Sequence, residues 1–233
     1  MSAVALSTPS FSERVLHLLE RVDYRRADSA EERDAIYRLR YEAYLREGAL
    51  KPDFTRKLSD RYDERDDTWT FGIYIGGQLA SSVRLHISVN GAADFPGAEV
   101  FPETILPELA AGKTIVDPTR FVADATCARL YPELPYVTLR LGFLAAEYFD
   151  TNYVLATVRS EHQAFYKRVF GHRPMCPPRQ YLTLTKPLSL MMLDFPPARE
   201  QILARYPFFR STFFERRMLF EQPAPAIAQL SAA

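Results

Sequence analysis

The sequence lacks an excess of charge of either sign, because its Lys and Arg residues and its Asp and Glu residues both number 29. A nucleic-acid-binding protein needs a basic excess or patch to bind the phosphate backbone, so this balance gives no electrostatic argument for that function. No apolar run approaches the roughly 20 residues of a membrane-spanning helix. Residues 1–20 are too acidic, and their apolar core is too short, for a secretory signal.

Cysteine and histidine are also scarce. The two cysteines, Cys127 and Cys176, do not have metal-ligand spacing, and the four histidines form no H-E-x-x-H motif or Cys/His cluster. We therefore expect reduced thiols, no metal ion, and a cytoplasmic enzyme or binding domain. The 233 residues, 47% of them hydrophobic, are enough for one substantial core or two small ones.

Hydrophobic periodicity predicts alternating helices and strands. Helical spacing predicts helices over residues 11–20, 30–47, 132–150 and 161–170, and another from about residue 197. Capping boxes are predicted at Ser29 with Glu32 and at Ser160 with Gln163. Strand patterns cover residues 22–28, 68–89 (a hairpin turning at Gly76 and Gly77), 114–124, 153–158 and 180–188. Residues 49–67 are expected to form a long ordered loop, and residues 90–112 a connection.

This order predicts a single α/β domain with a mixed, mostly antiparallel twisted sheet flanked by helices. One of its strands, TIVDPTRFVAD (residues 114–124), is interrupted by charged side chains and by a proline. Pro118 has no N–H and is expected to loosen the sheet ladder there. Asp117 and Arg120 beside it are therefore candidates for chemistry.

The order of elements resembles the GNAT acyltransferase fold. Four motifs resemble those of the acyl-homoserine-lactone (autoinducer) synthases and the related N-acyl amino acid synthases: YRLRYEAYLREG, LSDRYDERDDTWTFGIYIGGQLASSVRL, VDPTRFVAD and HQAFYKRVFGHRP. The resemblance extends over about residues 22–184. It implies a GNAT-like domain at residues 21–190, with an N-terminal helix at 1–20 and a C-terminal helical, aromatic and basic extension at 191–233.

Two features depart from the family patterns. The autoinducer synthases carry a tryptophan between the first long helix and the acidic loop, and residues 49–57 contain none. The pyrophosphate loop of CoA-dependent GNAT enzymes, Q/R-x-x-G-x-G/A, is also missing. These departures favour an N-acyl amino acid synthase without a bound cofactor. Its expected donor is a long-chain acyl thioester of acyl carrier protein (or of CoA), and its acceptor is an amino acid.

The resemblance implies roles for two residues in the chemistry. Asp117 is the candidate base or water-orienting acid on the amine side, and the alternative is an acid that only pairs with Arg120. Tyr166 lies where many GNAT enzymes place the tyrosine that donates to the leaving thiolate, and the alternative is core packing.

The implied substrate-binding residues are Arg40, Tyr44, Asp60, Asp63, Arg84, Arg120 and Phe121. Arg120 could hold a substrate carboxylate or lock the acidic loop through Asp60 or Asp63. Asp63 could bind the acceptor amine, whereas a solvated charge run that includes Asp66 is the alternative. Basic residues of the extension could dock an acidic carrier protein, namely Arg205, Arg210, Arg216 and Arg217.

Three other functions stay open at this point. The first is an autoinducer synthase that also lactonises S-adenosylmethionine, and the second is an acetyl-CoA-dependent N-acetyltransferase. The third is a non-catalytic GNAT-like module that binds acyl chains. The sequence determines neither the acyl length, nor the acceptor, nor the oligomeric state.

Overall fold

The structure is a computed structural model and describes residues 8–65, 67–181 and 184–222. Within these residues seven strands form one sheet in the order β1-β2-β3-β4-β5-β7-β6. All neighbouring strands are antiparallel except β4 and β5, which are parallel. The strands are β1 Val22–Arg26, β2 Thr68–Ile75, β3 Gln78–Ile87, β4 Ile115–Ala123, β5 Tyr153–Val158, β6 Arg173–Pro174 and β7 Ser189–Asp194. The predicted mixed, mostly antiparallel sheet is confirmed.

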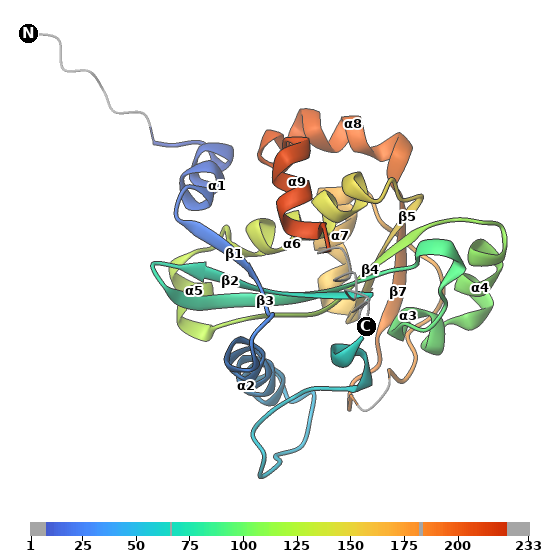
Figure 1. The fold of residues 1–233 in the computed structure, drawn as a ribbon, viewed down its shortest axis with the longest axis horizontal. Coiled ribbons are helices and arrows are strands. Elements are labelled where there is room, and N and C mark those ends of the chain that lie inside the picture. The colour runs from blue at the N-terminus through green and yellow to red at the C-terminus, as the bar shows by residue number, and fades with distance from the viewer. Residues whose placement is uncertain (1–7, 66, 182–183, 223–233) are drawn as a thin grey trace, which may run out of the picture.

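Helices cover both faces of the sheet (Figure 1). Helices α2, α3 and α4 lie on one side, and α1, α6, α7, α8 and α9 lie on the other. Their bounds are α1 Phe11–Leu19, α2 Ala30–Arg46, α3 Pro96–Val100, α4 Pro102–Ala110, α5 Ala125–Leu130, α6 Leu134–Tyr148, α7 Gln163–Phe170, α8 Phe195–Arg205 and α9 Phe213–Phe220. None of the helices in the described ranges is long and apolar enough to cross a membrane.

Local sequence signals explain several of these boundaries. The predicted capping box at the start of α2 is present, with the Ser29 side chain accepting from the Glu32 N–H and Glu32 accepting from the Ser29 N–H. The β2–β3 hairpin turns at Gly76 and Gly77, whose φ angles of 58° and 82° are the positive values that a primed turn requires. The early part of the fold thus follows from local chemistry.

Other predictions were wrong. The last long strand is β7 rather than residues 180–188, of which the described residues lie outside named strands. Residues 189–193 are buried on both faces, so their sequence lacks the alternation of apolar and polar residues that marks a strand with one exposed face. The connection at 90–112 contains α3 and α4, and α5 was also missed. Helix α7 starts at Gln163, so the capping box predicted at Ser160 does not form.

The C-terminal helices pack on the helix that covers the sheet. Arg140 of α6 donates to the carbonyl of Phe208 over 2.8 Å and pairs with Glu215 of α9 at 2.5 Å. Glu147, on the same helix, accepts from Ser211 and Arg216. Phe208, Phe209 and Phe220 belong to the same core as the sheet. Helix α6 is therefore held from both sides.

Candidate active site

Strand β4 carries two of the predicted residues, Asp117 and Arg120, and its pairing is irregular. It pairs with β5 only at its first two residues, Ile115 and Val116, so the parallel strands separate just before Asp117. Beyond this point the backbone groups of the two strands no longer form a ladder with one another. Such an opening between neighbouring strands gives a substrate access to backbone donors.

On its other side, β4 contains a bulge. The register with β3 passes from Ser82–Val122 to Arg84–Thr119, which leaves one extra residue in β4. Arg120 has a φ of 54°, in the left-handed region that non-glycine residues seldom adopt. In a regular strand Thr119 and Arg120 would face opposite sides of the sheet. The bulge changes the direction of the Arg120 side chain.

The bulge brings Arg120 into a buried cluster of three arginines and two aspartates. Arg84 and Arg120 each approach the Asp60 carboxylate at 2.6 Å. Arg40 pairs with Asp63 at 2.7 Å, and Arg84 approaches Asp63 at 3.0 Å. Asp63 lies in a 3-10 turn, η1 (Arg61–Glu64), and Asp60 is its N-cap. Both carboxylates also accept backbone N–H groups of this turn. The cluster fastens the acidic loop to α2 and to the sheet.

The cluster is a compensated charge network. Burial alone would raise the pKa of Asp60, but hydrogen bonds and charge from Arg84 and Arg120 hold this pKa well below its usual value. Arg120 therefore makes the contacts of the loop-locking alternative. Asp66 lies outside the described residues.

Asp117 is buried without such compensation. Its Oδ2 accepts one hydrogen bond, from the Gly97 N–H of α3 at 3.0 Å. Within the described residues Oδ1 has no hydrogen-bond partner, and Arg120 is not an ion-pair partner of this carboxylate. Burial raises the pKa of Asp117 to about 7, although the Gly97 N–H and the charge of Arg84 oppose the shift. A carboxyl with that pKa can gain or lose a proton near neutral pH.

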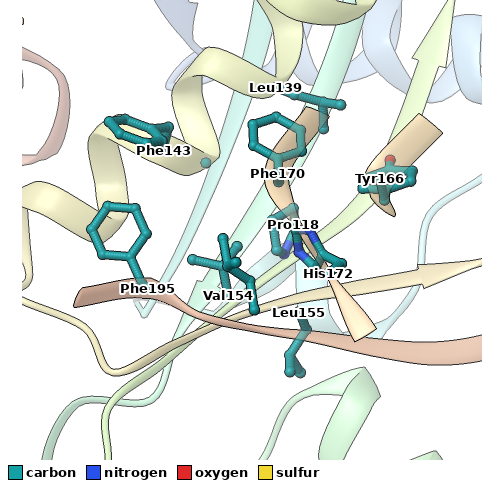
Figure 2. A pocket seen from close by; sticks show the side chains of 11 residues that line it. Pro118, Leu139, Phe143, Val154, Leu155, Tyr166, Phe170, His172 and Phe195 are labelled. Carbon is teal, nitrogen blue, oxygen red and sulfur yellow. The ribbon is translucent and has the colours of Figure 1, made fainter. Parts of the chain in front are cut away.

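An apolar cleft opens on the opposite side of β4, where Pro118 faces α6. Gly142 of α6 lies against Pro118, and an added Cβ there would come within 3.3 Å of the proline ring. Figure 2 shows aromatic side chains of α6 and α7 around this proline, with Tyr166 and its hydroxyl at one end. A water-sized sphere can enter only about 20 Å³ of this cleft, so the side chains that line it nearly fill it in this structure. Its lining is Pro118, Leu139, Gly142, Phe143, Val154, Leu155, Tyr166, Phe170, His172, Leu193 and Phe195.

Three aromatic residues of the predicted site lie in different surroundings. Tyr166 is half-buried, and burial raises its pKa above its ordinary value, which keeps the hydroxyl protonated. The Tyr44 ring lies 5.5 Å from the Arg120 guanidinium, so it belongs to the charged side of β4. Phe121 packs at the edge of the main core.

Three residues that border the site were not predicted from the sequence. Gly97 donates to Asp117 but lies in a segment read as a connection, and nothing in its neighbours indicates that role. Tyr181 is buried near Asp117 in a segment read as a regular strand. His172 lines the apolar cleft, and burial lowers its pKa to about 3, which keeps the ring neutral. The only sequence signal for His172 is its position directly after Gly171, the residue that ends helix α7.

Of the four arginines proposed to dock a carrier protein, two form ion pairs within this chain and two are exposed. Arg216 is half-buried and pairs with Glu147, and Arg217 pairs with Glu221. Arg205 and Arg210 are exposed. The extension is therefore only partly available to a partner.

Comparison with known proteins agrees with this geometry. The family model "N-acyl amino acid synthase FeeM" matches residues 35–194, which include every predicted site residue. The chain belongs to the FeeM family. It is accordingly an acyltransferase with the GNAT-like fold predicted from its motifs. No curated protein sequence matches the chain.

Solved structures show the same fold. FeeM, an N-acyl amino acid synthase from uncultured soil microbes, has 22% identity and a TM-score of 0.66, covering 81% of this chain and 98% of its own. MesI, a CoA-dependent acyl-homoserine lactone synthase, has 15% identity and a TM-score of 0.51, covering 82% and 97%. An acyl-CoA N-acyltransferase from Pseudomonas aeruginosa has 20% identity and a TM-score of 0.52, covering 74% and 99%.

Proposed function

We propose that this FeeM-family protein transfers a long-chain acyl group from a thioester to the amine of an amino acid. The observation that supports this most strongly is that the two faces of β4 have different chemical environments next to each other. Asp117 is an uncompensated buried carboxyl on one face, and Pro118 borders an apolar cleft on the other. A thioester that enters where β4 and β5 separate would therefore have Asp117, which could accept the proton of the amine, on one side. On the other side it would have the apolar cleft, which could hold the acyl chain.

The proposed chemistry on the amine side uses Asp117. An amino-acid amine is protonated at neutral pH and must lose protons to attack a thioester carbonyl. A carboxylate with a pKa of about 7 is a better base than an ordinary aspartate, whose pKa is near ~4. Asp117 would take a proton directly or through one water, while the Gly97 N–H holds its other oxygen.

The proposed chemistry on the thiolate side uses Tyr166. Its hydroxyl stays protonated because burial raises its pKa, and it lies at the end of the cleft lined by Pro118. It would donate to the sulfur as the carbon–sulfur bond breaks. Arg40, Arg84, Asp60 and Asp63 would hold the acidic loop over the acceptor without taking part in proton transfer.

Acyl carrier protein is the donor that we favour. Helix α7, which supplies Tyr166 to the cleft, also carries the exposed Lys167 and Arg168, and Arg205 of α8 donates to the Arg168 carbonyl at 3.2 Å. None of these three cations has an ion-pair partner among the described residues. A positive patch beside the cleft suits an acidic carrier protein.

The test is a set of reactions with three donors: a long-chain acyl-carrier-protein thioester, the same acyl-CoA, and acetyl-CoA. Each donor is combined with a mixture of the common amino acids and, separately, with S-adenosylmethionine. Products are followed by mass spectrometry. We expect N-acyl amino acids, formed faster from the carrier protein. Activity only with acetyl-CoA would contradict the long-chain assignment, and an acyl lactone formed from S-adenosylmethionine would identify an autoinducer synthase instead.

A further inference from the structure

Three polar atoms around Asp117 are buried and lack a partner in the described part of the chain. They are Oδ1 of Asp117, the hydroxyl of Tyr181 and Nη1 of Arg120. Buried polar atoms are almost always hydrogen-bonded, because leaving them unpaired costs free energy. Three unpaired atoms in one region therefore point to a polar ligand.

Tyr181 is placed beside the carboxylate by its packing. Its side chain belongs to the same buried cluster as Phe95 and Ala98, which lie on either side of the Pro96–Gly97 step that holds Asp117. Its ring lies 6.5 Å from that of Phe101, at the start of α4. Burial and then the nearby Asp117 raise the pKa of Tyr181 well above its ordinary value, whereas Arg120 lowers it. The hydroxyl thus remains a hydrogen-bond donor.

The three atoms have complementary roles. Oδ1 of Asp117 accepts hydrogen bonds, while the Tyr181 hydroxyl and Nη1 of Arg120 donate them. An α-amino acid offers the matching pattern, because its amine donates and its carboxylate accepts. A simple amine would leave the two donors unpaired.

On the basis of the proposed function, we propose that Tyr181 binds the acceptor. Its hydroxyl and Nη1 of Arg120 donate to the carboxylate of the amino acid, and the amine lies against Oδ1 of Asp117. This arrangement selects acceptors that have a free carboxylate next to the amine.

The test compares wild type and Tyr181→Phe with two acceptors and a long-chain acyl-carrier-protein donor. The acceptors are the amino acid that gives most product in the mixture and the amine that lacks only its carboxylate (phenylalanine and phenethylamine, for example). For the amino acid we expect KM to rise about 10- to 100-fold, the range for a hydrogen bond to a charged group. The KM for the donor stays unchanged, and wild type and variant do not differ with the amine.

An unchanged KM for the amino acid, or an equal rise for both acceptors, would overturn the assignment of Tyr181. A wild-type protein that acylates neither acceptor is a different result, which refutes the proposed function and this assignment with it.

A matched variant separates binding from folding. Tyr181→Phe loses no hydrogen bond to a described residue, so its melting temperature should equal or exceed that of wild type. Tyr24→Phe removes a 2.7 Å hydrogen bond to the Val137 carbonyl and should melt earlier with an unchanged KM. If Tyr181→Phe melts like Tyr24→Phe, its hydroxyl is structural and the assignment fails.

Discussion

Asp60 and Asp117 are two largely buried aspartates at strand β4, and their pKa values are shifted in opposite directions. Asp60 accepts from two arginines, and its pKa lies well below the usual value. Asp117 accepts one backbone N–H, and its pKa rises to about 7. Burial acts on both, so the arginine partners make the difference.

This difference in pKa distinguishes a structural carboxylate, Asp60, from a carboxyl group that could transfer protons, Asp117. A carboxylate locked by two guanidinium groups stays ionised through the physiological range and cannot exchange protons usefully. A buried carboxyl with one weak partner is costly for the folded state, and such groups tend to occur at functional sites. The two acids differ by only a few contacts, so single substitutions can test the distinction.

The largest expected effect is on turnover. Asp117→Asn removes the proposed proton acceptor and keeps the shape of the side chain, so turnover should fall about 10²- to 10⁴-fold, the usual contribution of a general base. The measurement is the initial rate of N-acyl amino acid formation at pH 8. A rate near that of wild type would remove Asp117 from the mechanism and end its contrast with Asp60.

The second effect is on stability. Arg84→Met removes the arginine shared by Asp60 and Asp63, while Asp60 keeps Arg120 and Asp63 keeps Arg40 as a partner. We expect the free energy of unfolding, measured in urea, to fall by about 1.5–3 kcal/mol, because hydrogen bonds to charged groups are lost but neither carboxylate is left without a partner. The control Arg25→Met breaks an exposed pair with Asp23, which should change the stability little because water screens the two charges. Equal losses in the two variants would show that the cluster does not stabilise the fold.

The smallest effect is expected at Tyr166. Tyr166→Phe should lower kcat about tenfold, less than is usual for a general acid, because a thiolate leaves readily. The KM for the amino acid should stay constant, since Tyr166 lies in the apolar cleft on the opposite side of β4 from Asp117. An unchanged kcat, with a lowered melting temperature, would assign Tyr166 to core packing with Phe165 and Phe170.

Much of the fold and part of the site could be predicted from the sequence. The capping box of α2 and the glycine pair of the hairpin determine local structure by themselves. The charges inside the β4 pattern were informative because a strand tolerates buried Asp117 and Arg120 only with specific partners. The sequence therefore indicated which strand to examine.

The partners themselves could not be predicted. Regular alternation places Arg120 on the face opposite Thr119, and only the bulge brings its guanidinium to Asp60. The Gly97 donor depends on a short helix that has no periodicity long enough to detect. Tyr181 lies in a segment whose alternating sequence predicts a strand that the structure does not contain, so periodicity gives no indication of the side chains around it.

The central claim, that Asp117 is buried without a compensating charge, is tested most directly by the pH dependence of stability. Burial raises its pKa from 3.8 to about 7 on folding, so the folded state holds this proton more tightly than the unfolded state. The stabilisation is therefore complete below about pH 4 and is lost as pH rises through about 7.

The measurement is the urea unfolding free energy of wild type minus that of Asp117→Asn, from pH 4 to pH 8, in which the contributions of Asp60 and the other acids cancel. We predict that this difference falls by about 4 kcal/mol over the range, since each pKa unit corresponds to about 1.4 kcal/mol. A difference that stays constant with pH would show that Asp117 titrates like an ordinary carboxylate and would contradict the account.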